Sequence, residues 1–162
     1  MKAITSIILA IALSMLCVAI GCQKQNVETD IAAIKDVLNQ YVVACDTNDF
    51  DSWISLWADD GVQMPPDAPA IVGKSQILEA NKPSFDQMKF DISIKSIEGA
   101  EVHGDWGLTH CTYTLSVTPK AGGDTIIVTP EGKALTIYKR QSDGSWKIAY
   151  DCFNSNAPPQ MD

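Results

Sequence analysis

The spacing of apolar residues changes partway along the chain, and the change predicts where helices give way to strands. In the first part, apolar residues recur every three or four positions, which places them on one helix face. They are Ile31, Ile34, Leu38, Tyr41 and Val42. Thr29 is the predicted N-cap of this helix. A second, shorter helix is predicted from Phe50, Trp53, Ile54 and Trp57, ending at Asp59-Asp60-Gly61.

The C-terminal half of the sequence has the alternation of strands. After a short strand over 62–64 and a third helical segment from Lys74 to about Asn81, the apolar spacing becomes two from Met88 onward. Further strands are predicted over 106–118, over 125–128 and 133–140 with an interruption at 130–132, and over 145–153. Helices followed by long antiparallel strands predict an α+β fold. We expect one curved antiparallel sheet wrapped around the N-terminal helices.

The first residues have the pattern of an export signal. Lys2 is followed by an uncharged, mostly apolar run that extends to Gly21. Residues 18–22 read Val-Ala-Ile-Gly-Cys and resemble the bacterial lipobox, although Ala19 stands where that motif usually has Leu. We therefore predict a signal peptide over 1–21, a lipid on Cys22 and a tether over 22–28. An uncleaved membrane anchor is the alternative, because the run is near the lower limit of about 17 residues for crossing a bilayer.

Charge and cysteine content narrow the location and the partners. The full chain has a net charge of −8, which excludes nucleic-acid binding by phosphate neutralisation. We predict a cell-envelope protein, and Gln23 after the lipidated cysteine favours the periplasmic face of the outer membrane. Cys45, Cys111 and Cys152 remain after export and lipidation. Buried free thiols are the favoured interpretation, and a disulfide between two of them is the alternative.

Two segments carry a family resemblance. Residues 41–50 (Tyr-Val-Val-Ala-Cys-Asp-Thr-Asn-Asp-Phe), followed by Trp-Ala-Asp-Asp-Gly at 57–61, resemble the opening of SnoaL-like and ketosteroid-isomerase-like domains of the nuclear-transport-factor-2-like (NTF2-like) superfamily. Residues 132–155 resemble a branch known only as a domain of unknown function. The resemblance predicts a domain over 29–157 with a tail over 158–162. It implies a cone-shaped half-barrel, a pocket between sheet and helices, and homodimers through the outer sheet face.

The resemblance also implies positions for isomerase chemistry. Ketosteroid isomerases use a carboxylate base, with a tyrosine and a protonated carboxylic acid as donors to the oxyanion. Tyr41 matches the tyrosine. The base position falls on Pro65 and the acid position falls near Thr136, so this chain is not a standard ketosteroid isomerase.

A different catalytic pair is suggested by the strands. Strand alternation and the resemblance together suggest that His110 and Asp151 both point into the pocket, as a base and its orienting partner. The alternative is a polar pair that closes the barrel. We predict neither a metal site nor a cofactor, since the sequence has no metal-ligand spacing, phosphate loop or dinucleotide fingerprint.

The favoured function is binding of a small, partly apolar ligand. The predicted pocket residues are Tyr41, Trp57, Met64, Trp106, His110, Asp151 and Phe153. One alternative is an enzyme of the isomerase, dehydratase or hydrolase type that uses His110 and Asp151. The other is a dimerisation or docking module without a ligand.

Overall fold

The computed structural model describes residues 26–157. The predicted signal peptide, the lipidated Cys22 and the tail over 158–162 lie outside the described residues. The elements are α2 (Val27–Asp46), α3 (Phe50–Ser55), β1 (Trp57–Met64), β2 (Ile71–Val72), α4 (Lys74–Gln87), β3 (Met88–His103), β4 (Trp106–Pro119), β5 (Ile126–Arg140) and β6 (Trp146–Ser155). None of the helices in this part of the chain combines the length and apolar character needed to cross a membrane.

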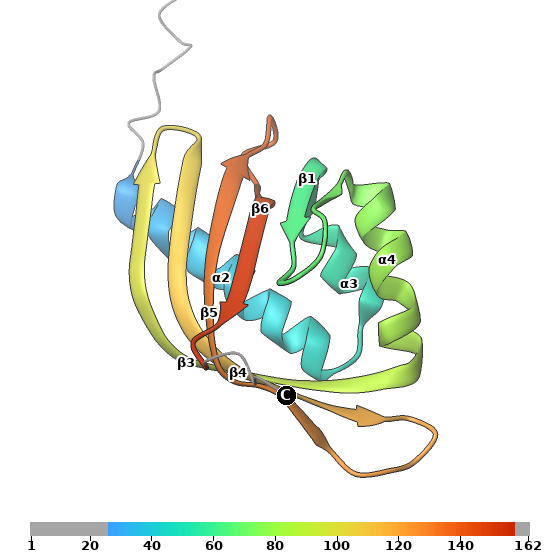
Figure 1. The fold of residues 1–162 in the computed structure, drawn as a ribbon. Helices are drawn as coiled ribbons and strands as arrows, with labels where there is room; N and C mark the ends of the chain where they lie inside the picture. Colours follow the sequence, from blue (N-terminus) through green and yellow to red (C-terminus); the bar gives the residue numbers. More distant parts are fainter. Residues whose placement is uncertain (1–25, 158–162) are drawn as a thin grey trace, which may run out of the picture.

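One six-stranded sheet carries the fold, with the strand order β2-β1-β6-β5-β4-β3. Strands β3 to β6 form consecutive antiparallel pairs, and β1 joins the edge of β6 in parallel. The sheet curves without closing, and α2 runs diagonally across its concave side while α3 and α4 lie beyond β1 (Figure 1). The predicted α+β half-barrel is confirmed.

Helix α2 begins earlier than predicted. Its N-cap is Asn26, whose side chain accepts hydrogen bonds from the backbone N–H groups of Glu28 and Thr29 at 3.2 and 3.4 Å. Thr29 is therefore inside the helix, because the asparagine three residues upstream satisfies the first free backbone donors. The predicted apolar face is buried at Ile34 and Leu38 and half-buried at Tyr41.

Helix α3 is shorter than predicted, and Trp57 belongs to a strand. The backbone N–H of Ile148 donates a 2.8 Å hydrogen bond to the carbonyl of Leu56, so pairing with β6 starts where the helix stops. Trp57 is only 1% exposed and packs on Trp53, with 5.6 Å between ring centroids. The helical spacing of Trp57 was consistent with either structure, and tertiary pairing selects the strand.

Two elements run longer than predicted. Helix α4 continues to Gln87, with Pro83 inside it, because Phe85 packs into the core at 4% exposure. Strand β5 continues through Pro130, where an interruption was predicted. The pairing of β5 with β4 accommodates this region through register shifts around Leu115. The resulting β4–β5 hairpin projects beyond the body of the sheet (Figure 1).

Candidate functional site

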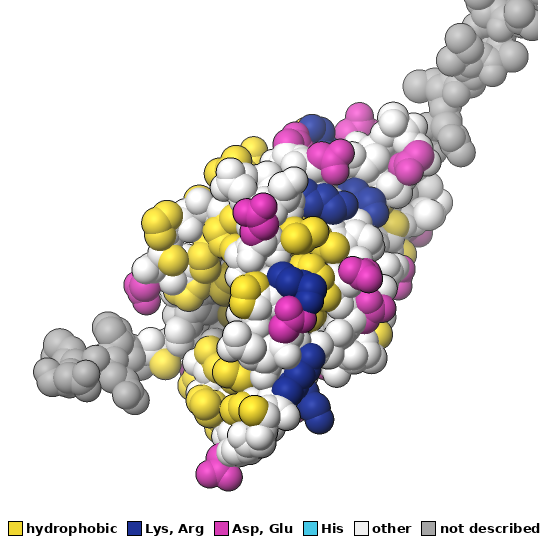
Figure 2. Space-filling view, turned by 90° about the vertical axis from the view of Figure 1, so that its right-hand side faces the viewer, with side chains coloured by type: hydrophobic (Ala, Val, Ile, Leu, Met, Phe, Trp, Pro, Cys, Tyr) yellow, Lys and Arg dark blue, Asp and Glu magenta, His cyan; other side chains and the backbone are white. Residues whose placement is uncertain are grey.

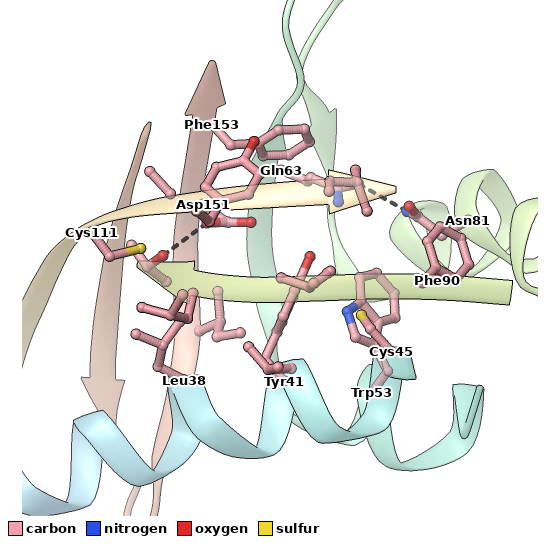
Figure 3. Close-up of a pocket in the computed structure, with 18 of the residues that line it drawn as sticks. Leu38, Tyr41, Cys45, Trp53, Gln63, Asn81, Phe90, Cys111, Asp151 and Phe153 are labelled. Carbon is pink, nitrogen blue, oxygen red and sulfur yellow. Dashed lines mark hydrogen bonds between the residues drawn. The ribbon is translucent and has the colours of Figure 1, made fainter. Parts of the chain in front are cut away.

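A pocket of about 190 Å³ lies on the concave side of the sheet, between the C-terminal half of α2, helix α4 and strands β3 to β6. Its walls are mostly aliphatic and aromatic (Figure 3). The lining residues are Leu38, Tyr41, Val42, Cys45, Trp53, Gln63, Asn81, Ser84, Phe85, Phe90, Ile92, Ile94, Cys111, Tyr113, Leu115, Ala134, Thr136, Tyr138, Ile148, Asp151 and Phe153. An apolar cavity with few polar groups is typical of a small-molecule site.

A row of buried polar side chains crosses the inner face of the sheet. Gln63 on β1 pairs in register with Asp151 on β6, Asp151 pairs with Thr136 on β5, and Thr136 pairs with Thr109 on β4. All four are at most 6% exposed. Residues in register on adjacent strands point to the same face, so the strand pairing gathers these groups. Gln63, Thr136 and Asp151 reach the pocket itself.

Asp151 is the one carboxyl among the residues that line the pocket. Its Oδ1 accepts a 2.9 Å hydrogen bond from Thr136 Oγ1. Burial disfavours the charged form and raises the pKa of Asp151 to about 6, while the hydrogen bond from Thr136 partly opposes that rise. The carboxyl can therefore exchange a proton close to neutral pH.

Gln63 is oriented by a neighbour on α4. Asn81 Nδ2 donates a 2.8 Å hydrogen bond to the backbone carbonyl of Ile77 and another 2.8 Å hydrogen bond to Gln63 Oε1. A carbonyl only accepts, so Asn81 must present its nitrogen here and Gln63 its oxygen. The amide nitrogen of Gln63 is left without a hydrogen-bond partner in the described part of the chain.

Tyr41 adds a hydroxyl from the helix side. Figure 3 shows its side chain extending from α2 across the pocket toward the level of Asp151 and Gln63. Burial raises the pKa of Tyr41 well above its ordinary value, and the charges of Cys45 and Asp151 would raise it further. The hydroxyl therefore keeps its proton at physiological pH.

The two pocket thiols are unreactive by the same reasoning. Burial raises the pKa of Cys45 strongly and that of Cys111 to about 11, so both remain protonated. Thiolates, not thiols, act as nucleophiles. Cys45, Cys111 and Cys152 are all free; the first two are buried as favoured, whereas Cys152 is exposed.

Three of the seven predicted pocket residues line the cavity: Tyr41, Asp151 and Phe153. Trp57 is buried in the hydrophobic core and does not line the pocket. Met64 does not line the cavity. Its neighbour Gln63 is the residue of β1 that does. Sequence reasoning missed Gln63 because a strand of three residues gives no reliable alternation.

The orientation predicted for His110 is wrong. His110 is exposed, and Trp106 on the same face is 42% exposed with Lys139 Nζ 5.5 Å from its ring centroid. Around His110 the inward residues of β4 are Gly107, Thr109 and Cys111. His110 and Asp151 thus lie on opposite faces of the sheet, and the predicted catalytic pair is not formed.

The close approach of α2 explains why small residues face inward on β4. A Cβ atom on Gly107 would lie 3.2 Å from two carbon atoms of Ile34. Larger side chains on that face would displace the helix, so the bulkier Trp106 and Leu108 occupy the other face. Pro65, at the position implied for an isomerase base, follows the end of β1 and does not line the pocket.

A curved, unclosed sheet wrapped around an N-terminal helix, with a pocket in its concavity, defines the NTF2-like class of cone-shaped domains. Within that class the chain belongs to the SnoaL-like domain family, whose model matches residues 27–150. No curated protein matches the sequence.

Solved structures agree with this assignment. A ketosteroid isomerase-like protein from Erwinia carotovora atroseptica is 27% identical, with a TM-score of 0.69 over 80% of this chain and 98% of that one. A conserved protein from Planctomyces limnophilus is 25% identical, with a TM-score of 0.67 over 77% and 94% of the two chains. An NTF2-like superfamily protein from Salmonella enterica, at 16% identity, has a TM-score of 0.71 over 83% and 96%, a similarity of fold.

Proposed function

We propose that this domain binds a small, largely apolar molecule in the concave pocket, with Asp151 as its polar anchor. The observation that carries the proposal is a carboxyl only 6% exposed, in an apolar cavity, with one oxygen held by Thr136. Its other oxygen has no partner among residues 26–157. A carboxyl oxygen left open to an otherwise apolar cavity can anchor the polar end of a ligand.

A pocket-filling variant tests the proposal. Ala134 lines the pocket on β5, whereas Lys133 next to it is exposed on the outer face. We expect a panel of steroids, polyketide-like acids and envelope metabolites to include compounds that raise the melting temperature of the wild type. Ala134→Phe should abolish that shift and Lys133→Phe should retain it. The proposal fails if no compound in the panel binds, or if hits bind equally to a folded Ala134→Phe protein.

A second candidate function is proton transfer by Asp151. A carboxyl with a pKa of about 6 suits general acid–base chemistry near neutral pH. Such a group could remove a proton next to a substrate carbonyl and return it elsewhere, and His110 has no part in this version. Cyclic ketones incubated in D₂O provide the assay, since enolisation replaces their α-protons with deuterium. Exchange that is catalysed by the wild type and persists in Asp151→Asn would contradict this role.

We also propose that the domain is held at the cell envelope by a lipid on Cys22. The support is the resemblance of residues 18–22 to the lipobox. From Cys22 to Asn26 the chain could reach at most about 14 Å, so the start of α2 would lie close to the bilayer. The pocket-lining part of α2 begins at Leu38, about 18 Å further along the helix. Labelling with a fatty-acid analogue in a bacterial host should mark the wild type but not Cys22→Ser.

We further propose that two copies associate through the outer sheet face. This face exposes large apolar side chains from three adjacent strands, with Trp106, Leu135 and Tyr150 each at least 40% exposed. Burial of such a surface stabilises dimers. Sedimentation should show a dimer that Leu135→Asp dissociates. A wild type that stays monomeric at all concentrations would refute the proposal. The β4–β5 hairpin adds separate apolar surface at Ile126–Val128, at the lower end of the view in Figure 2.

A further inference from the structure

The polar end of the pocket is built from two side chains on neighbouring strands. Gln63 and Asp151 are direct partners in the parallel β1–β6 pairing, 4% and 6% exposed, and both line the cavity. Figure 3 shows them side by side at the same wall of the pocket. A ligand that reaches this wall meets both groups at once.

Each of these side chains has one polar atom fixed by the protein and one that is not. Asn81 occupies Gln63 Oε1 and Thr136 occupies Asp151 Oδ1. What remains toward the ligand is the amide nitrogen of Gln63, which only donates, and Asp151 Oδ2, which accepts when the carboxyl is ionised. The wall therefore presents a donor beside an acceptor, in a fixed order.

We propose that this pair recognises an amide-type head group, in which a C=O and an N–H lie on the same edge as in a lactam or imide, on an otherwise apolar body. The inference rests on the proposed ligand-binding function of the pocket. The carbonyl of the ligand accepts from Gln63 Nε2, and its N–H donates to Asp151 Oδ2. Both unpaired polar atoms are then satisfied by one planar group.

Other head groups fit this wall less well. A ketone or lactone offers only acceptors and leaves Asp151 Oδ2 unpaired. A carboxylate places a second negative charge next to Asp151 in an apolar cavity, where like charges repel strongly. Sites that hydrogen-bond a ligand N–H discriminate against an analogue without it, because the buried partner is left unsatisfied.

A matched set of bicyclic probes separates these cases. Quinolin-2(1H)-one carries the lactam edge, coumarin replaces the N–H with an oxygen, and N-methylquinolin-2-one blocks it. We expect calorimetric titration of the wild type near pH 7.5 to give quinolinone binding roughly tenfold tighter than coumarin or the N-methyl compound. Asp151→Asn should reduce this preference to roughly twofold or less, because Thr136 holds the oxygen and the amide nitrogen left facing the ligand cannot accept. Gln63→Met should weaken quinolinone and coumarin alike by roughly tenfold, because both carbonyls lose the same donor. Gln40→Met, on the exposed face of α2, should leave both affinities unchanged.

Acid pH supplies a readout that a merely steric preference would not give. Below the pKa of about 6, Asp151 donates instead of accepting, so the lactam preference should shrink. The other titratable groups that interact with Asp151 are Tyr41, Cys45, Cys111, Tyr113 and Tyr138. All have raised pKa values, so they stay neutral across this range and only Asp151 changes charge.

The outcomes distinguish the two levels of the argument. Equal binding of quinolinone and coumarin to the wild type overturns the lactam inference and leaves the binding function intact. The same holds if quinolinone fails to bind a pocket that accepts other apolar compounds. Absence of binding by every probe and by the whole panel overturns the proposed function as well.

Discussion

Thr136 Oγ1 donates a 2.9 Å hydrogen bond to Asp151 Oδ1 across the β5–β6 pair, and the two residues are direct partners in the register of those strands. The family resemblance implied an acid near position 136, where the chain has a hydroxyl. The acid is instead present on the next strand, at the same level of the pocket. This wall of the pocket therefore has a carboxyl, and β6 supplies it.

The first prediction concerns the pH dependence of stability. The pKa of Asp151 is raised by burial to about 6, above its ordinary value, so the folded state binds the proton more tightly than the unfolded state. The contribution of Asp151 to stability should be fully present below about pH 4 and should be lost as pH rises to about 6, by on the order of 2–3 kcal/mol. Urea unfolding at several pH values measures this change.

Asp151→Asn supplies the comparison for that prediction. The uncharged, similarly shaped side chain can still accept from Thr136, so the variant should lose the pH dependence between 4 and 6 and exceed the wild type in stability at pH 8. Asp60→Asn, an exposed carboxyl paired with Lys139, is the control and should behave like the wild type. A carboxyl that titrates near 4 in carbon-detected NMR would contradict this account.

The second prediction isolates the hydrogen bond from Thr136. Thr136→Val removes the donor with little change of shape, so the pKa of Asp151 should rise further, because the bond favours the charged form. The cost at pH 8 should be about 1–3 kcal/mol, since the bond is made to an ionised group. Thr109→Val is matched to it, because Thr109 bonds Tyr138 at 3.0 Å instead of Asp151. NMR titration should show a shift of the Asp151 carboxyl in the first variant alone.

The change in apolar spacing, from every three or four residues to every second residue, was sufficient to predict the fold. Helical spacing gave α2 and the position of Tyr41. Alternation put Asp151 and Phe153 on one face of β6, and the family resemblance implied that this face points inward. The apolar spacing is a local property of the sequence, so it can be read without knowing which distant residues pack against the element. Trp57 and the length of α4 depended on contacts with distant residues, namely the pairing of Leu56 with Ile148 and the packing of Phe85.

Two features of the sheet prevented the remaining site residues from being predicted from the sequence. Around His110 the inward face of β4 carries small residues, because α2 lies close to Gly107, and the larger apolar residues on the other face misled the assignment of His110. A register shift between Ile137 and Tyr138 also changes the pairing of β5 with β6. The hairpin turn alone would place Thr136 opposite Tyr150, and the bulge moves it opposite Asp151.

The third prediction concerns the ion pair that holds the start of α2 on the sheet. Arg140 Nη2 lies 2.6 Å from Asp30 Oδ2, and the guanidinium stacks 4.3 Å from the ring centroid of Trp146. The hydrogen bond from Arg140 lowers the pKa of Asp30, so this contribution to stability is present above the ordinary carboxyl range and is lost as pH falls through the lowered value. Asp30→Asn should cost on the order of 1–3 kcal/mol, because it leaves the partly buried guanidinium with only the longer, 3.3 Å contact to Asp105.

The exposed pair of Lys82 and Asp86 provides the reference for this measurement. Both side chains are about half exposed, and such pairs contribute little, so Asp86→Asn should change the free energy of unfolding by less than about 0.5 kcal/mol. Urea denaturation near neutral pH measures both variants. Equal, small effects of the two substitutions would show that Arg140 does not depend on Asp30 to hold α2 in place.

The fourth prediction links a glycine to the shape of the pocket. Gly132 on β5 is the register partner of Tyr113 on β4, and a Cβ atom built on it would lie 2.4 to 2.7 Å from three atoms of the Tyr113 ring. The ring lies over the bare backbone, and Tyr113 lines the pocket. Gly132→Ala should therefore push the ring aside at a cost of about 1–3 kcal/mol, and it should change ligand affinity, because the wall of the pocket moves.

Gly99→Ala is the matched control for this change. Gly99 is also a strand glycine, on β3, but nothing lies within 4 Å of a Cβ added there. That substitution should be neutral or slightly stabilising, because alanine loses less backbone entropy on folding. Tyr113→Leu, which removes the ring, should make the Gly132 site tolerant, so the double variant with Gly132→Ala should be no less stable than Tyr113→Leu alone. A large additional loss in the double variant would mean that Gly132 is needed for its own backbone conformation, and the link between this glycine and the pocket wall would be refuted.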